Sequence, residues 1–293
     1  MASSRSWEDI VEVRERCAEG VERGKQVWAA SEYGAYRLAL DAPGEFAAAA
    51  VVSGAGRHTL GPLWEVAAST HEWAELEPHL DMGDHRELVA RERALRGEDV
   101  GQVPAHTYDI PVAPEQWEPR YAVAVYRADG ADFPEPEVDR YEALEVPAAT
   151  AEVTEDDDVL DALHDLVEPW TGSVQTVAVR GSTADAIAAT GASAVVAKRL
   201  EPQDAIARMG WAGASGGAHG RRRGAAVGRY NAWWAVANLA GAEWPDLGGE
   251  GSRLEWLAWR PADFTEGWEL HLAIADPERG LAWAIAATDV VDT

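Results

Sequence analysis

The stretch GWELHLAIADPERGLAWAIAATD, residues 267–289, decides the fold class of the C-terminal part of this chain. Large apolar residues alternate with smaller or polar ones from Trp268 to Ile274, and the alternation resumes from Leu281 to Ile285. A period of two is typical of β-strands, and the intervening DPERG is rich in turn-forming residues. The stretch therefore predicts an antiparallel β-hairpin.

The residues before the hairpin predict further strands and helices in alternation. RLEWLAWR, residues 253–260, has the pattern of a third strand. Upstream, a helix at 156–168 is followed by the strand VQTVAVRG, the helix STADAIAAT, the strand SAVVAKRL and a helix beginning at Glu201. This order predicts an α+β domain over residues 151–293.

The N-terminal part has helical periodicity and little strand signal. Helices are predicted from Trp7 onward and at 28–40, 43–53, 60–77 and 83–96, separated by short turns. Short helices in succession resemble a helical-repeat stack, although no sequence period repeats. We therefore predict an all-helical domain over residues 1–100.

A proline-rich segment, residues 101–150, follows the helices and rules out long helices there. Within it, YAVAVYRADG predicts one short strand. The segment is also richer in aromatic residues than disordered chains are. We expect it to bridge the two folded parts.

The charge balance indicates a salt-adapted protein. The 293 residues include 51 acidic and 25 basic ones, for a formal net charge of -26, and Lys25 and Lys198 are the only lysines. Molar salt screens the repulsion within such a surface and also weakens phosphate binding by counterion release. We therefore expect a halophilic protein that does not bind nucleic acid.

The sequence carries no signal for secretion, membrane insertion or a cysteine-bound metal. Cys17 is the single cysteine, and neither a leader-like segment nor a long apolar run occurs. These features predict a cytoplasmic protein without a cofactor and without a membrane partner.

The stretch SGGAHGRRRGAAVGRYNAWW, residues 215–234, gathers positive charge in this acidic chain. Gly220, Gly224 and Gly228 are four residues apart, as on one face of a helix that packs closely against a neighbour. Arginines flank that face at four positions, with a histidine and a serine just before them: Arg221, Arg222, Arg223, Arg229, His219 and Ser215.

Two interpretations of this stretch remain open. The arginines can pair with carboxylates of the N-terminal domain and act as an interdomain clasp. Alternatively, a glycine-rich turn before a helix, with guanidinium groups beside it, can bind a phosphate or carboxylate. Neither a Walker A motif nor GxGxxG after a strand is present. We favour the clasp.

A second polar cluster contains His71, Glu75 and His79. His71 and Glu75 would share a helix face, as metal ligands or a proton-transfer pair do. HExxH is not satisfied, because Glu75 stands where its second histidine would be, and Pro78 interrupts the helix. These three are weak candidates, and we expect no metal site.

Four blocks of the sequence resemble an uncharacterised family, a domain of unknown function found in actinobacteria and salt-loving archaea. They are GPLWEVAASTHEWAELEPHL, WEPRYAVAVYRADGADFP, WAGASGGAHGRRRGAAVGRYNAWW and GWELHLAIADPERGLAWAIAATD. The resemblance implies no activity and no catalytic residue.

No established catalytic constellation is present in the sequence. We therefore expect a non-catalytic interaction or scaffold protein with an unidentified protein partner. Its 14 tryptophans suit binding surfaces as well as cores. The alternative is an enzyme or sensor that binds a small anionic ligand, phosphorylated or carboxylated, over residues 215–229.

Overall fold

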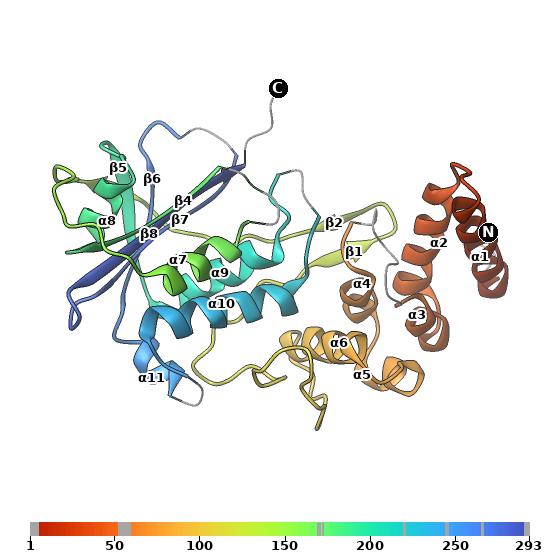
Figure 1. Cartoon of the computed structure of the whole chain (residues 1–293). Coiled ribbons are helices and arrows are strands. Elements are labelled where there is room, and N and C mark those ends of the chain that lie inside the picture. The colour runs from red at the N-terminus through yellow and green to blue at the C-terminus, as the bar shows by residue number, and fades with distance from the viewer. Residues whose placement is uncertain are drawn as a thin grey trace. The chain divides into compact units, whose positions relative to one another are not determined.

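The structure is a computed structural model of the chain, and it divides into two compact units (Figure 1). Unit 1 comprises residues 1–115, 123–134 and 221–226, and unit 2 comprises residues 116–122, 135–220 and 227–293. The residues described are 6–51, 60–168, 171, 173–218, 221–243, 246–264 and 267–289. The chain thus contributes several separate segments to each unit.

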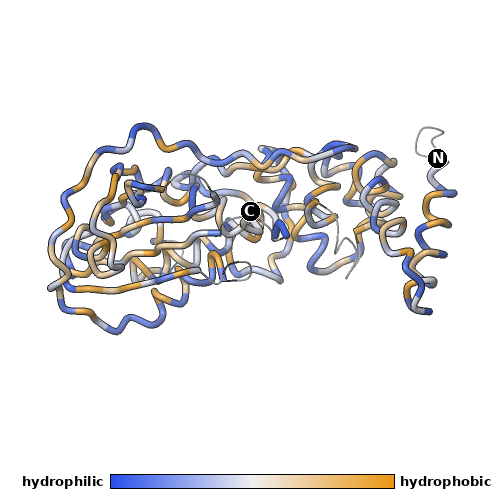
Figure 2. The backbone as a smooth tube through the Cα atoms, turned by 90° about the horizontal axis from the view of Figure 1, so that it is seen from above, coloured by the Kyte–Doolittle hydropathy of each residue, from blue (hydrophilic) through white to orange (hydrophobic). Residues whose placement is uncertain are grey.

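Unit 1 is built mainly from helices. They are α1 (Trp7–Glu22), α2 (Trp28–Asp41), α3 (Gly44–Ala50), α4 (Leu63–Thr70), α5 (Trp73–Leu76), the 3₁₀ helix η2 (Glu77–His79) and α6 (Asp84–Leu95). Helix α2 packs on α1 and α4, and α4 packs on α6. Figure 2 shows hydrophilic and hydrophobic residues alternating along α1, the pattern of a helix with one buried face. Helices are thus present in each of the regions where the sequence predicted them.

One prediction for this unit needs correction. The helix expected over 60–77 is interrupted at His71, which has extended backbone angles, so α4 and α5 are separate. The short strand expected within YAVAVYRADG is present as β1 (Val125–Arg127). It pairs with β2 (Gly130–Asp132), a strand that was not predicted.

Unit 2 is an antiparallel sheet with helices. Its strands are β3 (Glu142–Leu144), β4 (Val174–Arg180), β5 (Val195–Leu200), β6 (Glu255–Pro261), β7 (Trp268–Asp276) and β8 (Leu281–Asp289), and its helices are α7 (Asp157–Asp165), α8 (Thr183–Ala189), α9 (Pro202–Ala214), α10 (Ala225–Ala240, from Val227 onward) and α11 (Leu247–Gly251). The strand order is β3-β5-β6-β7-β8-β4. The α+β class is confirmed.

The predicted hairpin lies inside this sheet. Strands β7 and β8 pair from Trp268 with Asp289 to Asp276 with Leu281, and β6 is the third strand that the sequence predicted. Ala273 of β7 packs in the cluster that includes α8, whereas Trp268 stacks on Trp211 of α9. Because odd and even strand residues point to opposite faces, α8 and α9 cover opposite faces of the sheet.

The predicted division into residues 1–100, 101–150 and 151–293 concerns which parts of the chain fold as separate domains. It stays a prediction. Within the described residues, no helix is both long and apolar enough to cross a membrane.

Candidate functional site

Arg222, the middle arginine of the triplet, is bound by a glutamate of α4. Its Nε donates to Glu65 Oε2 at 2.9 Å and to Oε1 at 3.2 Å, and its Nη2 donates to Oε1 at 2.9 Å. The two side chains are 5% and 0% exposed. Both residues belong to unit 1, although they lie 157 positions apart in sequence. The contact is therefore a buried, bidentate ion pair.

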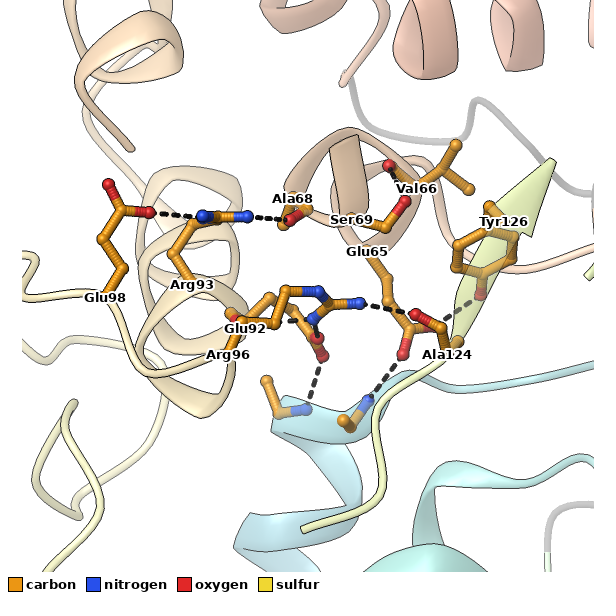
Figure 3. A network of polar contacts seen from close by, with 12 residues as sticks. Glu65, Val66, Ala68, Ser69, Glu92, Arg93, Arg96, Glu98, Ala124 and Tyr126 are labelled. Carbon is orange, nitrogen blue, oxygen red and sulfur yellow. Dashed lines mark hydrogen bonds and ion pairs between the residues drawn. The ribbon is translucent and has the colours of Figure 1, made fainter. Parts of the chain in front are cut away.

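Two carboxylates lie at the amino-terminal end of α10 (Figure 3). The backbone N–H of Ala225 donates to Glu65 Oε1 at 3.1 Å, and that of Ala226 donates to Glu92 Oε1 at 2.7 Å. The first N–H groups of a helix carry partial positive charge and bind anions. The position that a phosphate would take at this helix therefore holds carboxylates of the chain itself.

Further donors complete the surroundings of these carboxylates. Tyr126 of β1 donates its hydroxyl to Glu65 Oε2 at 2.6 Å. Arg96, the residue that follows α6, donates to Glu92 Oε2 at 2.5 Å and, through Nη2, to the Ala124 carbonyl at 2.9 Å. Figure 3 shows these side chains converging from α4, α6 and β1. The network thus joins three elements of unit 1 to the start of α10.

The two glutamates have pKa shifts of opposite sign. Burial would raise the pKa of Glu65, but the charge and hydrogen bonds of Arg222, with help from Tyr126, lower it below the ordinary value. The pKa of Glu92 is raised, first by burial and then by the charge of Glu65, against the influence of Arg96. The pKa of Arg222 is raised, because Glu65 outweighs the effect of its burial. Glu65 and Arg222 are therefore both charged near neutral pH.

Gly224 precedes α10 in a conformation that suits glycine. Its φ is 99°, and a Cβ atom there would stand 2.1 Å from the Trp64 ring. The helix begins only at Ala225, so Gly224 lies before it and is not part of the predicted helical stripe. Arg221, Arg222 and Arg223 accordingly precede the helix instead of forming its first turn.

Arg229 and Gly228 lie within unit 2, on α10. Arg229 donates from Nε and Nη2 to the two carboxylate oxygens of Glu118, each at 2.7 Å, and its guanidinium lies 5.5 Å from the Trp233 ring. Tyr121 donates to the same carboxylate at 2.9 Å. A Cβ on Gly228 would stand 2.0 Å from the Gly210 carbonyl oxygen of α9. This turn of α10 therefore combines close backbone packing with a second buried ion pair.

The remaining residues of the predicted site lie in several places. His219 and Gly220 are outside the described residues. Ser215 follows α9, where its hydroxyl accepts hydrogen bonds from the Trp268 indole at 3.1 Å and from the Gly217 N–H at 3.0 Å. The hydroxyl of Ser215 thus helps to fix the indole of Trp268 in β7.

The three weak metal candidates do not form a ligand set. His71 is buried, with Nε2 at 2.6 Å from the Ala42 carbonyl oxygen. Glu75 completes a capping box with Glu72, and His79 lies in η2. Across the described ranges, no group of three histidine, cysteine or acidic residues is arranged to hold a metal ion.

A groove with aromatic side chains in its lining lies beside α2 in unit 1. We call it the α2 groove; it has a volume of about 330 Å³, and its lining includes Trp28, Glu32, Tyr33, Tyr36, Leu60 and Asp129. Trp28, Tyr33 and Leu60 are 47%, 55% and 46% exposed. The Oε2 atom of Glu32 is buried and has no hydrogen-bond partner among the described residues. Aromatic surface and an unsatisfied acceptor therefore meet in one groove.

A model of a protein family, described as a family of unknown function, DUF6183, matches residues 1–291. The chain belongs to the DUF6183 family. This agrees with the resemblance to an uncharacterised family, and the taxonomic distribution of the family stays an expectation. Neither a curated protein nor a solved structure matches the chain.

The carboxylates that bind the arginines of this DUF6183 chain were not predicted. Glu65 and Glu92 lie in predicted helices, and Glu118 lies in the segment interpreted as a bridge. The sequence did offer one signal for Glu65: it is a single charged residue in the largely apolar stretch LWEVAAST, and a glutamate that is buried needs a partner. Nothing in the sequence alone could have assigned each glutamate to its arginine.

Proposed function

We propose that this DUF6183 chain is a non-catalytic interaction protein, and that its α2 groove binds a basic side chain of a protein partner. The observation that carries the proposal is Glu32, whose buried Oε2 atom has no hydrogen-bond partner among the described residues. A buried acceptor left unpaired costs about 1–3 kcal/mol, so a donor supplied by a partner would be bound favourably.

The charges around the groove suit a cationic group. Asp129 adds a second carboxylate to the lining. Burial lowers the pKa of Arg14 in α1, and the nearby charges of Glu15 and Glu32 oppose this shift. The Arg14 guanidinium nevertheless donates its hydrogen bond to the Ala49 carbonyl, at 3.2 Å, and not to Glu32. Among the described residues, therefore, no donor forms a hydrogen bond with Glu32 Oε2.

The aromatic walls suit the same ligand. Tryptophan and tyrosine rings attract ammonium and guanidinium groups over their faces, with about 0.5–2 kcal/mol per contact. Trp28 and Tyr33 present about half of their surface to solvent beside Glu32. A volume of about 330 Å³ fits one or two side chains, and not a folded domain. We infer that the groove takes an arginine or lysine from an extended segment.

We further infer that the arginine stretch is an internal clasp and not a ligand site. The support is that Glu65 already binds the Nε and Nη2 edge of Arg222 and the first N–H group of α10. A phosphorylated or carboxylated ligand would have to displace a buried carboxylate from three donors. That competition disfavours an enzyme or sensor site over residues 215–229.

We also propose that the protein works in the cytoplasm of a salt-loving organism. The net charge of -26 and the scarcity of lysine support this environment. At molar salt the Debye length is about 3 Å, so the specificity of the groove would depend on contact with Glu32 and not on long-range attraction.

The test uses capped octapeptides with one central arginine or lysine, and matched peptides with citrulline or norleucine at that position. Binding to the full chain is measured by isothermal titration calorimetry in molar KCl. We expect the basic peptides to bind, and Glu32→Gln to weaken binding about tenfold or more, because a hydrogen bond to a charged group contributes about 1.5–3 kcal/mol.

Two substitutions serve as matched controls. Glu8→Gln removes the same charge from an exposed position of α1 and should leave binding unchanged. Trp28→Ala should weaken binding, whereas Trp234→Ala should not, although the two tryptophans are 47% and 49% exposed. Equal affinity for the arginine and citrulline peptides, or no binding of any basic peptide, would overturn the proposal.

A further inference from the structure

A polar cavity of about 380 Å³ lies within unit 2 and plays no part in the proposed groove function. Its lining includes Glu135, Pro136, Tyr141, Arg208 of α9, Arg260 of β6 and Glu269 of β7. We call it the Arg208 cavity. It brings two guanidinium groups and several carboxylates together in a space large enough for a small metabolite.

Arg208 is buried without a full set of partners. The side chain is 4% exposed. Its Nη1 donates two hydrogen bonds, to the Pro136 carbonyl at 3.2 Å and to Glu135 Oε1 at 3.5 Å. Its Nε is buried and has no hydrogen-bond partner among the described residues. A buried guanidinium with a single occupied nitrogen retains much of the cost of its desolvation.

Three other buried arginines make, through Nε, a contact with a carboxylate that Arg208 lacks. Arg222 and Arg229 each present the Nε and Nη2 edge to a glutamate, at distances of 2.7–3.2 Å. Arg91 also donates from Nε to a carboxylate, Glu87, at 2.7 Å. In Arg208 the corresponding donor is unused, and the residue lines a cavity. A carboxylate from outside the chain would complete the arrangement that the other three arginines have within it.

The acidic residues of the cavity indicate that the ligand also carries a positive group. Burial raises the pKa of Glu135, and the charge of Glu269 adds to this rise while Arg208 opposes it. Glu269 lies 4.0 Å from Arg260 Nη1, which is at the outer limit of an ion pair. An ammonium group near Glu135 and Glu269 would relieve their mutual repulsion.

The backbone next to the cavity is strained. Arg140, the neighbour of Tyr141, has a φ of 32°, and no other non-glycine residue in the described ranges has a positive φ. Such conformations cost about 1–3 kcal/mol and persist where surrounding structure holds them, often at ligand sites. Here the strain lies beside Tyr141, whose ring stacks 4.5 Å from the Arg260 guanidinium.

We propose that the Arg208 cavity binds a small zwitterion of the α-amino acid class. The carboxylate of the ligand accepts hydrogen bonds from the free Nε edge of Arg208, and its ammonium group lies toward Glu135 and Glu269. Guanidinium suits the first task because its donors match a carboxylate in a bidentate way.

The test measures binding of the proteinogenic amino acids to the full chain by thermal shift and calorimetry in molar KCl. We expect at least one to bind, and its carboxamide and its deaminated acid to bind at least about tenfold more weakly. These comparisons use the unmodified chain, so they do not depend on how a variant folds. If inorganic phosphate or a simple carboxylic acid binds as well as every amino acid, or if none binds at millimolar concentration, the proposal is wrong.

Substitutions then assign the contact to Arg208. Arg208→Lys keeps the charge but removes the bidentate edge and should weaken binding at least about tenfold. Arg199→Lys, at a side chain that is 73% exposed on β5, is the matched control and should have no effect. Glu269→Gln should weaken binding of the amino acid but not of its deaminated acid. Unchanged affinity in both Arg208→Lys and Glu269→Gln would also overturn the proposal, and Glu32→Gln should leave this affinity unchanged because it tests the α2 groove alone.

Discussion

Arg229 and Glu118 face each other across two hydrogen bonds of 2.7 Å in the interior of unit 2, with side chains 1% and 0% exposed. The two residues come from α10 and from residues 116–122, a segment that contains no helix or strand. A buried ion pair therefore helps to hold an irregular segment in place, together with the tilted contact of Trp117 and Trp233, whose ring centroids lie 5.1 Å apart.

Replacing Glu118 by glutamine should destabilise the chain strongly. The substitution leaves the Arg229 guanidinium buried without its counter-ion, which costs about 3–5 kcal/mol. Urea denaturation followed by tryptophan fluorescence measures the loss in the free energy of unfolding. Glu142→Gln, at an exposed position of β3, is the control and should change stability by less than about 0.5 kcal/mol. Similar stabilities for the two variants would contradict the role given to the pair.

Gly224→Ala should cost more than an ordinary glycine substitution at positive φ. The backbone strain is about 1–2 kcal/mol, and contact with Trp64 adds an overpacking cost of about 1–3 kcal/mol. Gly97→Ala is the matched control, because Gly97 has a φ of 89° but nothing within 4 Å of a Cβ. Thermal and urea unfolding of both variants would separate the two costs.

The double variant Gly224→Ala with Trp64→Leu provides the decisive comparison. If Trp64 is the obstacle, the glycine substitution should cost less in the Trp64→Leu background than in the parent chain. An unchanged cost would assign the whole effect to the backbone angle.

The pH dependence of stability should carry opposite signs for Glu65 and Glu92. The pKa of Glu65 is lowered by folding, so its stabilisation is present above the ordinary glutamate pKa of about 4.3 and is lost as pH falls through its folded pKa. The pKa of Glu92 is raised, so its contribution is largest below about 4.3 and is lost as pH rises through its folded pKa.

Glutamine variants measured across acidic pH would check these signs. The stability advantage of the parent chain over Glu65→Gln should shrink as pH falls below about 4.3. Relative to Glu92→Gln, the parent chain should instead lose stability as pH rises above that value. Urea unfolding at constant KCl gives both differences, and parallel pH profiles for parent and variants would contradict the assigned shifts.

Salt should stabilise the folded chain. Raising KCl from dilute to molar concentration screens repulsion among 51 acidic residues that face 25 basic ones, so the melting temperature should rise. Sucrose at matched osmolality controls for changes in water activity. A melting temperature that falls with KCl, or that rises equally with sucrose, would show that screening is not the cause.

The elements that were predicted from sequence depend on local patterns. The β7–β8 hairpin and the helices α2 and α6 follow from periodicities within single windows of about ten residues. The start of α10 was misplaced because Gly220, Gly224 and Gly228 repeat every four residues, as a helix face does. Glycine also serves at positive φ, and the sequence does not distinguish that use from close packing.

The candidate sites depend on long-range contacts and were largely out of reach of the sequence. Arg222 had 51 acidic residues as candidate partners, and no local pattern selects Glu65 among them. Glu32 and Arg208 were not singled out, because what distinguishes each is an unpaired buried atom. An atom without a partner is recognised only once the positions of all its neighbours are known.

The strand order of unit 2 has a consequence for how the chain folds during synthesis. Strand β4 lies at the edge of the sheet and pairs with β8, more than a hundred residues further along the chain. Similarly, unit 1 includes residues 221–226, which supply Arg222 to Glu65. During synthesis, therefore, the helices of unit 1 are made before the arginine that neutralises Glu65. Strand β4 remains without its partner for longer, until β8 (Leu281–Asp289) has been made.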